Sequence, residues 1–452
     1  MSRVGARGSF SRTRAGRILL AAVGALWIWR VAATTLAAWL AHDAPDFALW
    51  LSPGSSDALV WRTEQALGQD PQAPLESIPA LETPKALAES AALLAQGVAA
   101  PMVSPDLPPA EREARRRDVA RAWANAPLDA RAPRLLAQLA DAPDATRALM
   151  RESLRLSQHE DLARYWLLQD AFVRRDAARQ IELADGYLRG QPSAYQLVIP
   201  FIANLVVGDD APLLLRALQA NPPWRHLALG QLPESVRDPR SVLGLLIELK
   251  QGPTPPTLGE RNAFVSYLAR TRQFALARQA LEALTDEPDR TVGLGLFDGG
   301  FRRSRSPSPF AWKMTFADGV SLRFAPAPGL ADKNALDLQF MGRTVDDFGI
   351  AQLMLLPAGR YVLTGRQNGH LLARRALRWS VTCVETPHTP LAHSDRLSGG
   401  ETWTDFRFGF EVPGHDCEGQ QLSLALDAVS ISERIVSGEL YLTDLALERA
   451  AP

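Results

Sequence analysis

The chain has 452 residues, which is long enough for two or three domains of ordinary size. Hydrophobic residues make up 46% and charged residues 22%, so most of the chain has the composition of a soluble globular protein. Lys and Arg number 49 against 50 Asp and Glu, and the net charge is −1. This balance excludes the broad basic face of a nucleic-acid-binding protein, and we expect no nucleic-acid partner.

The strongest local charge asymmetry lies at the N-terminus. Residues 1–17 carry five arginines and no acidic residue, whereas residues 18–40 are apolar apart from two threonines and Arg30. A helix over this run is long enough to cross a bilayer core of about 30 Å. Because positive charge is retained in the cytoplasm, we predict a cytoplasmic basic tail over 1–17 and one transmembrane helix over 18–40. The body would then lie in the periplasm, held at a bacterial inner membrane.

Two alternatives remain open for this segment. A cleaved signal peptide would use Ile18–Trp29 as its apolar region, but no A-x-A site follows shortly, and Thr35-Leu36-Ala37 is the nearest approximation. Arg30 lies near the middle of the span, where an arginine costs roughly 2.5–3.5 kcal/mol on insertion scales. Either the apolar span tolerates it by snorkelling, or Arg30 contacts an acidic group in the membrane helix of a partner.

Residues 45–285 are predicted to form an all-α repeat domain, because apolar residues recur there at helical spacing between short turns. Thr83-Pro84 suits a helix start, and the four prolines of Val98–Pro109 indicate a linker. Further helices are predicted over 111–125, 128–140, 144–156, 159–174, 177–189, 194–207, 211–220, 241–250, 258–270 and 274–284. Short helices joined by short turns pack as antiparallel neighbours and, when repeated, form a solenoid.

This segment resembles tetratricopeptide-type repeats. Asn262–Leu284 looks like one helical pair, and Phe47–Leu59 looks like a repeat junction, although no repeat keeps the full pattern of that family. The resemblance implies a surface that binds a protein partner in the cell envelope. Tyr165, Trp166 and Trp224 are interpreted as packing residues of helix pairs.

From about Gly293 on, short runs of alternating apolar and polar residues replace the helical spacing. Residues 293–450 are therefore predicted to form an all-β jelly-roll sandwich. The predicted strands are 310–316, 320–324, 335–340, 351–356, 360–364, 371–383, 403–412, 422–426 and 439–447. The whole chain is therefore predicted to be multidomain: a transmembrane helix, a helical solenoid and a β-sandwich.

Alternation gives each strand a buried side and an outer side. Leu377, Trp379, Val381 and Cys383 should face the core, and so should the set Phe406, Phe408, Phe410 and Val412.

The opposite side of that second strand then carries Trp403, Asp405, Arg407 and Glu411. An aromatic ring with a carboxylate and a guanidinium on one sheet face can bind a sugar by stacking and polar contacts. The alternative is an ordinary solvated strand face with a tryptophan at its edge.

Cys383 and Cys417 are the two cysteines of the chain, and both fall in the predicted β domain. In an oxidising compartment such a pair is expected to form a disulfide, which supports the predicted periplasmic location. The alternative is two buried thiols in a cytoplasmic protein.

The β domain resembles the galactose-binding-like jelly rolls used as carbohydrate-binding modules. Gly295–Phe301 is similar to their opening strand motif N-G-x-F-E, and Gly438–Glu448 is similar to their closing strand. Many such modules hold a structural calcium ion between these strands, which would nominate Asp298 and Asp444. However, the acidic residue of the motif is replaced by Arg302, which puts the calcium in doubt.

Together these features look like accessory proteins of bacterial exopolysaccharide assembly or export. We therefore predict a non-catalytic periplasmic scaffold whose helices bind a protein partner and whose sandwich binds glycan or protein, with no resident cofactor. One alternative is a polysaccharide lyase or glycosidase, although the sequence shows no paired carboxylates or Tyr/His constellation of that kind. The other alternative is a structural component of an envelope secretion complex.

Overall fold

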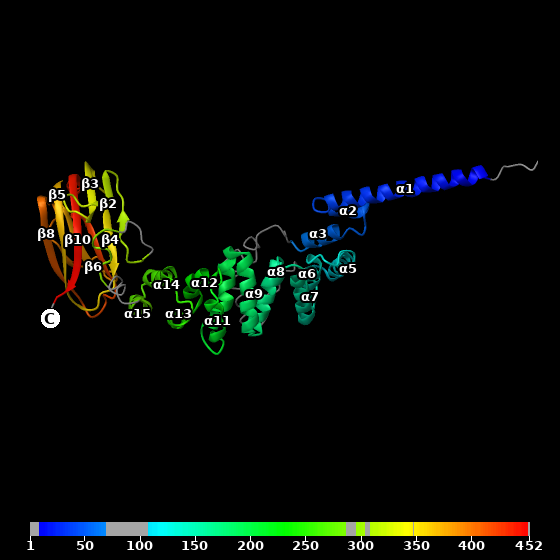
Figure 1. Ribbon diagram of the computed structural model, residues 1–452, viewed down its shortest axis with the longest axis horizontal. Helices are drawn as coiled ribbons and strands as arrows, with labels where there is room; N and C mark the ends of the chain where they lie inside the picture. Colours follow the sequence, from blue (N-terminus) through cyan, green and yellow to red (C-terminus); the bar gives the residue numbers. More distant parts are fainter. Residues whose placement is uncertain (1–8, 69–106, 286–294, 303–307, 347, 451–452) are drawn as a thin grey trace, which may run out of the picture. The chain divides into compact units, whose positions relative to one another are not determined.

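The computed structural model describes residues 9–68, 107–285, 295–302, 308–346 and 348–450 (Figure 1). The chain folds into two compact units, residues 1–217 with 222–224 and residues 218–221 with 225–452. The helix predicted to begin at Thr83 lies outside the described residues. Each unit is described separately.

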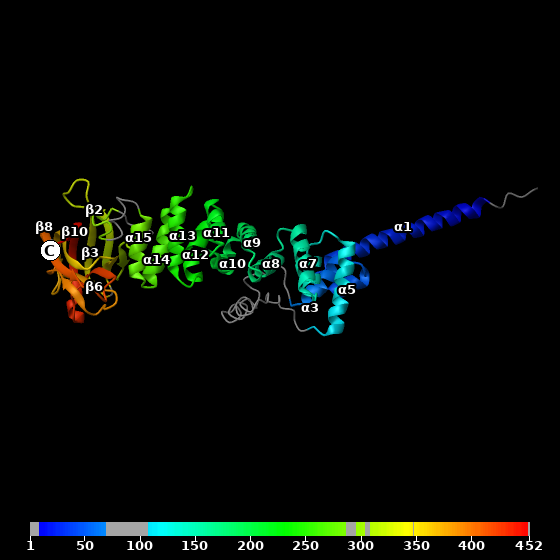
Figure 2. The ribbon, with the colours of Figure 1, turned by 90° about the horizontal axis from the view of Figure 1, so that it is seen from below.

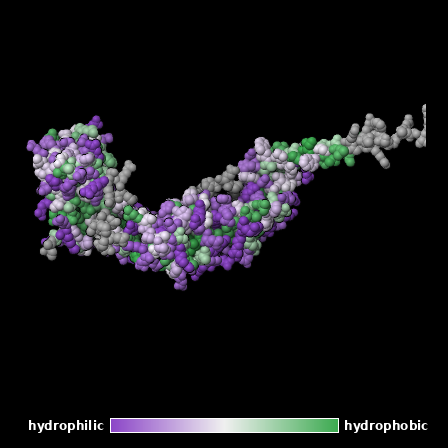
Figure 3. All heavy atoms as spheres, viewed as in Figure 1, coloured by the Kyte–Doolittle hydropathy of each residue, from purple (hydrophilic) through white to green (hydrophobic). Residues whose placement is uncertain are grey.

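The first unit begins with α1 (Ser9–Leu40), one long helix. Its segment Ile18–Leu40 is long and apolar enough to cross a membrane, a property that a signal sequence shares. Large apolar side chains along it are exposed, with Trp27 and Trp29 exposing 72% and 62% of their surface (Figure 3). The apolar helix is therefore confirmed, while anchoring and the periplasmic body stay predictions.

The other described residues of the first unit form short helices, most of which pack against the next described helix in the chain. They are α2 (Pro45–Leu51), α3 (Ser56–Ala66), α5 (Pro109–Asn125), α6 (Arg131–Gln138), α7 (Pro143–Leu156), α8 (Asp161–Val173), α9 (Ala177–Gly190), α10 (Tyr195–Ala203) and α11 (Ala211–Gln219), which ends at the unit boundary. Local chemistry sets several starts: Pro143 suits the first turn of α7, and Asp176 accepts a hydrogen bond from the Arg179 backbone to cap α9. The aromatics Tyr165, Trp166 and Trp224 are buried, so their interpretation as packing residues is confirmed.

Among the described residues of the second unit, the helices that precede the sandwich are α12 (Arg225–Ser235), α13 (Pro239–Gln251), α14 (Leu258–Arg270) and α15 (Phe274–Leu284). The pair predicted within Asn262–Leu284 is confirmed as α14 and α15, and a capping box between Thr257 and Glu260 begins α14. The sequence prediction missed α12, because Pro233 lies inside it and two prolines precede it. The tetratricopeptide-type pattern itself stays a prediction.

The β domain is a sandwich of two five-stranded antiparallel sheets, which confirms the predicted fold class (Figures 1 and 2). One sheet has the order β1-β4-β9-β6-β7 and the other the order β2-β3-β10-β5-β8. The strands are β1 (Lys313–Thr315), β2 (Val320–Pro326), β3 (Asn334–Thr344), β4 (Gly349–Met354), β5 (Gly359–Leu372), β6 (Leu377–Cys383), β7 (Pro390–His393), β8 (Gly399–Val412), β9 (Gln420–Leu426) and β10 (Ile435–Arg449).

Side chains from both sheets form one hydrophobic core, in which Trp379 and Leu440 are fully buried. The alternation predicted for β6 is confirmed, since Leu377, Val381 and Cys383 face the same core.

The prediction of a single strand over 371–383 is wrong. The chain turns after Leu372, where β5 ends, and β6 begins at Leu377. Apolar residues on both sides of Arg374 and Arg375 imitate one continuous alternating pattern, which conceals the turn. The short strand β7 was not predicted.

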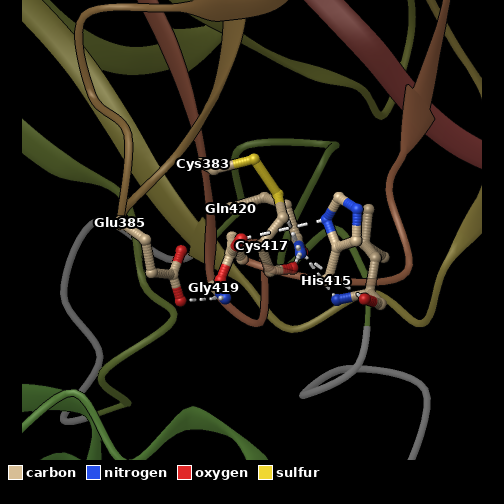
Figure 4. Close-up of a disulfide and its surroundings, with 8 residues drawn as sticks. Cys383, Glu385, His415, Cys417, Gly419 and Gln420 are labelled. Atoms are coloured by element: carbon tan, nitrogen blue, oxygen red, sulfur yellow. Dashed lines mark hydrogen bonds and ion pairs between the residues drawn. A yellow bond between two sulfur atoms is a disulfide. The ribbon is translucent and has the colours of Figure 1, made fainter.

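Cys383 and Cys417 form the predicted disulfide, with their Cα atoms 5.0 Å apart (Figure 4). Cys383 ends β6, and Cys417 lies in the turn that leads from β8 into β9. The backbone N–H of Gly419 donates to Glu385 Oε1 (3.3 Å) beside it. The bridge therefore ties the β8–β9 turn to the end of β6.

Candidate functional site

The candidate site lies on the outer face of the sheet β2-β3-β10-β5-β8. Along β8, Phe408, Phe410 and Val412 are buried, whereas Asp405 is exposed and Arg407 lies on the same outer side, as the alternation predicts. Phe406 is only partly buried and packs against the core. The strand therefore separates its core side from a polar outer side.

A hollow of about 470 Å³ lies on this face where β5, β8 and β10 meet. Its lining residues are Thr364, Gly365, Arg366, Asp405, Phe406, Arg407 and Asp444. Antiparallel register explains why they meet, because Arg366 pairs with Asp405 and Thr364 pairs with Arg407 across β5 and β8. Residues paired in this way present their side chains on the same face of a sheet.

Both carboxylates of this hollow have cationic partners. Arg366 Nε lies 3.6 Å from Asp405 Oδ1, and Arg366 Nη1 lies 3.8 Å from Asp444 Oδ2. Lys333 Nζ approaches the same Asp444 oxygen at 2.6 Å. Within the part of the chain that the structure describes, Arg407 has no such ion pair.

Trp403 stands at the start of the same face, where its ring is held in place. Its Nε1 donates a hydrogen bond to the carbonyl oxygen of Pro328 (2.8 Å), which lies in the loop between β2 and β3. The guanidinium carbon of Arg366 lies 5.7 Å from the ring centroid, in cation–π range. Arg366 therefore connects the tryptophan with the two carboxylates of the hollow.

Farther along the outer face, Tyr441 on β10 adds another polar ring. Its hydroxyl donates to Glu439 Oε2 (3.0 Å), and burial together with this acidic neighbour raises the pKa of Tyr441. The single phenolic proton is already donated to Glu439, so the Tyr441 oxygen remains available only as an acceptor.

The structure brings together only part of the predicted glycan-binding set. Asp405 and Arg407 line the hollow, and Trp403 contacts Arg366 beside it. Glu411 shares their strand but does not line the hollow, and it faces Arg360 Nε at 3.4 Å instead.

Sequence reasoning missed Arg366 and Thr364 as members of this site. The strand predicted over 360–364 stopped before Arg366, whereas β5 continues to Leu372. Gly365 and Gly369 interrupt the apolar pattern there, and glycine usually indicates a turn. Residues 366–370 are a continuous polar run with a glycine, so no alternation remained in the sequence that could have extended the strand.

Asp298 and Asp444, the pair nominated for calcium, line a second hollow together with Arg302. Gly299 explains their proximity: its carbonyl accepts from the backbone N–H of Leu445 (3.0 Å), and a Cβ at Gly299 would lie 1.9 Å from the Leu445 carbonyl oxygen. The opening segment and the closing strand are thus joined, as the resemblance implies.

The residues around this second hollow fit a calcium ion poorly. Ca²⁺ takes six to eight oxygen ligands, yet the ammonium of Lys333 already lies on Asp444. Among the described residues, no group of three or more His, Cys, Asp and Glu side chains could hold a metal ion. The calcium stays a prediction, and no function is derived from it.

Arg30, the other predicted contact residue, is exposed on α1. Its proposed pairing with a membrane partner stays a prediction.

The chain matches no known protein-family model, and no curated protein matches it. Solved structures similar to the β domain include a CBM4 structure (12% identity, TM-score 0.26, covering 34% of this chain and 99% of that chain). TmCBM61 in complex with β-1,4-galactotriose is another (13% identity, TM-score 0.25, covering 34% of this chain and 99% of that chain). A third is the CBM22-1 xylan-binding domain of Paenibacillus barcinonensis Xyn10C (14% identity, TM-score 0.24, covering 35% of this chain and 98% of that chain). These likenesses carry no conclusion about what this chain binds.

Proposed function

We propose that this protein is a non-catalytic scaffold of the bacterial cell envelope whose β-sandwich binds glycan on its outer face. The observation that carries the proposal is the hollow of β5, β8 and β10, which is lined by Arg407 and by the paired Arg366 and Asp405. Arg366 also lies over the ring of Trp403.

The chemistry of these side chains suits a carbohydrate. Sugar rings present apolar C–H faces that pack on an aromatic ring, and their hydroxyls both donate and accept hydrogen bonds. Trp403 offers the ring, Asp405 and Asp444 offer acceptors, and Arg407 offers donors in a rigid fork. The open hollow fits a chain that lies along the sheet rather than a small molecule that is enclosed.

The same proposal assigns places to the other parts of the chain. The apolar run of α1 supports a single-pass anchor in the inner membrane, and the disulfide supports a body in the oxidising periplasm. The helices α2 to α15 would bind a protein partner of the envelope, as antiparallel helical arrays can. We propose exopolysaccharide assembly or export as the process.

A binding screen against bacterial polysaccharides tests the proposal, using the full chain in detergent. Trp403→Ala should weaken binding about tenfold or more, which corresponds to about 1.4 kcal/mol. Phe316→Ala is the matched control, because Phe316 is an aromatic residue of the same domain that is 65% exposed and does not line the hollow. The control should bind like the unchanged protein.

The remaining outcomes decide between this function and its alternatives. If the folded protein binds no polysaccharide, the glycan-binding role is wrong, and a structural part in a secretion complex becomes the better explanation. If the purified chain degrades a polysaccharide, the protein is an enzyme of the lyase or glycosidase class. Equal loss of binding in both variants would place the glycan site elsewhere.

A further inference from the structure

We infer that α2 lies on the outer surface of the membrane, with Phe47 and Trp50 inserted among the lipid headgroups. The inference rests on the proposed anchoring of α1. It concerns which residues after the span lie at the level of the outer lipid headgroups. It assigns a lipid-binding role to a seven-residue helix that follows the span.

The first argument is the packing of α1. Its last turns bury Ala33 and Ala37, and Ala41 follows just beyond the helix end. Ala37 and Ala41 form one apolar cluster with Ala48 of α2 and Ala58 of α3. Small side chains allow this close approach, so α2 is fixed beside the C-terminal end of α1 (Figure 1).

The second argument is length. A helix rises about 1.5 Å per residue, so Ile18–Ala32, which precedes the packed turns, spans only about 22 Å. The hydrocarbon core is about 30 Å thick. The bilayer must therefore reach beyond Ala33, into the turns of α1 against which α2 packs. This brings α2 to the level of the outer headgroups.

The third argument is the side chains that α2 presents there. Phe47 and Trp50 stack on each other with ring centroids 5.6 Å apart, and their side chains are 49% and 72% exposed. Trp39, in the last turn of α1, is 75% exposed. Tryptophan favours the membrane–water interface, where its ring is buried and its N–H stays near water. Exposed aromatics continuous with the span therefore fit lipid better than water.

The polar residues nearby agree with an interfacial position. Asp46 of α2 lies 3.5 Å from Arg62 of α3, and Arg62 also binds Asp118 at 2.6 Å. Arg62 is shared by the two aspartates, so the three groups keep a net charge of −1, and the side chain of Asp46 is 85% exposed. Such charges belong at the water side of the headgroups. The occupant of the aromatic surface is thus the bilayer itself.

Fluorescent labelling tests the inference on the full chain reconstituted in phosphatidylcholine vesicles. Trp50→Cys is labelled with an environment-sensitive NBD group, and the native cysteines do not react because they form a disulfide. Phe47→Cys serves as a second position. Ile28→Cys reports the span, and Phe316→Cys reports a water-exposed aromatic site outside it.

We expect nitroxides at the lipid headgroup to quench the labels at positions 47 and 50 more strongly than nitroxides deeper in the bilayer do. We also expect aqueous iodide to quench these two labels several-fold less than it quenches the label at position 316. The label at 28 should respond to nitroxides deep in the acyl chains. If the labels at 47 and 50 respond to iodide like the label at 316 while 28 stays in lipid, only the position of α2 is wrong. If 28 is also in water, the anchoring itself is wrong.

Shielding of positions 47 and 50 from iodide without quenching by any nitroxide lipid would also contradict the inference. Protein, either a second copy or another chain, would then cover the surface instead of lipid.

Discussion

Arg366 determines how charge is arranged in the hollow of the outer sheet face. Its guanidinium approaches Asp405 and Asp444 and lies over Trp403, so it holds three side chains that come from two different strands. Arg407 lines the same hollow and has no ion pair among the described residues. Arg366 is therefore a positioning residue, and Arg407 is the residue that we expect to contact a ligand.

Replacing Arg407 by alanine should weaken glycan binding by about 1.5–3 kcal/mol, because a hydrogen bond from a charged donor is lost. Arg407→Lys should recover only part of this, since an ammonium group cannot reproduce the planar fork of donors. Titration calorimetry of the full chain measures both.

Arg360→Ala is the matched control for Arg407. Arg360 is an exposed arginine of the same sheet that faces Glu411 and does not line the hollow. If Arg360→Ala lowers the affinity as much as Arg407→Ala does, the effect is general electrostatics and the assignment to the hollow fails.

Elements far apart in the sequence are connected by a few buried polar contacts. Arg134 of α6 forms an ion pair with Glu64 of α3, and its Nε donates to Glu160 Oε2 (3.0 Å). Arg134 and Glu64 expose only 2% and 0% of their side chains. Burial raises the pKa of Glu64, while the guanidinium of Arg134 opposes that shift. The pair thus holds α3 and α6 together across the segment that separates them in the chain.

Arg134→Met should destabilise the contact between α3 and α6 by about 3–5 kcal/mol, because Glu64 is left buried without its main cationic partner. The double variant Arg134→Met with Glu64→Gln should recover much of that loss. Hydrogen exchange of peptides from α3 and α6, read by mass spectrometry, measures the change. Equal exchange in Arg134→Met and the unchanged protein would show that the ion pair does not stabilise this contact.

Replacing both cysteines, Cys383→Ser with Cys417→Ser, should lower the free energy of unfolding of the sandwich by about 3–4 kcal/mol, the chain-entropy value for a loop of 34 residues. Hydrogen exchange of peptides from β6 and β9, followed over increasing denaturant, measures the unfolding of the sandwich. The unchanged protein in a reducing agent is the control and should show the same loss. Full stability under both conditions would mean that the bridge adds nothing to the sandwich.

For the whole molecule, the prediction that concerns all parts of the chain is its orientation across a membrane. The five arginines of residues 1–17 and the neutral, apolar run after them predict a cytoplasmic tail and a periplasmic body. The disulfide agrees with this orientation, because its partners lie in the domain farthest from the tail along the chain. A retained anchor and a cleaved signal sequence would both give this orientation.

A membrane-impermeant maleimide should label Phe316→Cys in spheroplasts, where the periplasmic side of the inner membrane is accessible. It should not label sealed inverted vesicles of the same membrane until detergent is added. Mass spectrometry of the labelled chain should still find residues 1–17. Labelling in the inverted vesicles instead would place the body in the cytoplasm, and loss of residues 1–17 would indicate cleavage.

Arg30→Leu should leave the envelope partners that co-purify with the protein unchanged, because a strongly apolar span tolerates one arginine by snorkelling. Affinity purification with quantitative mass spectrometry compares the two proteins, with Thr35→Leu in the same helix as the control. Selective loss of one membrane partner from Arg30→Leu would show that Arg30 pairs with an acidic group of that partner.

Sequence alone determined the features that depend on local pattern. The spacing of apolar residues along the chain predicted the apolar run of α1, the helices up to Leu284 and the buried faces of β6 and β8. The presence of two cysteines in one domain predicted the disulfide.

Only the tertiary structure decided which strands lie beside each other. Register and a long strand β5 bring Arg366 to Asp405, while a left-handed Asp444 (φ 52°) in the irregular part of β10 joins the same hollow. Packing of alanines in α1 against α2 likewise placed Phe47 and Trp50 beside the span. The strand contacts join residues that are distant in sequence, and no local propensity determines which distant strand a side chain will lie beside. The contact of α1 with α2 joins residues that are near in sequence, and it depends on how the chain turns between the two helices.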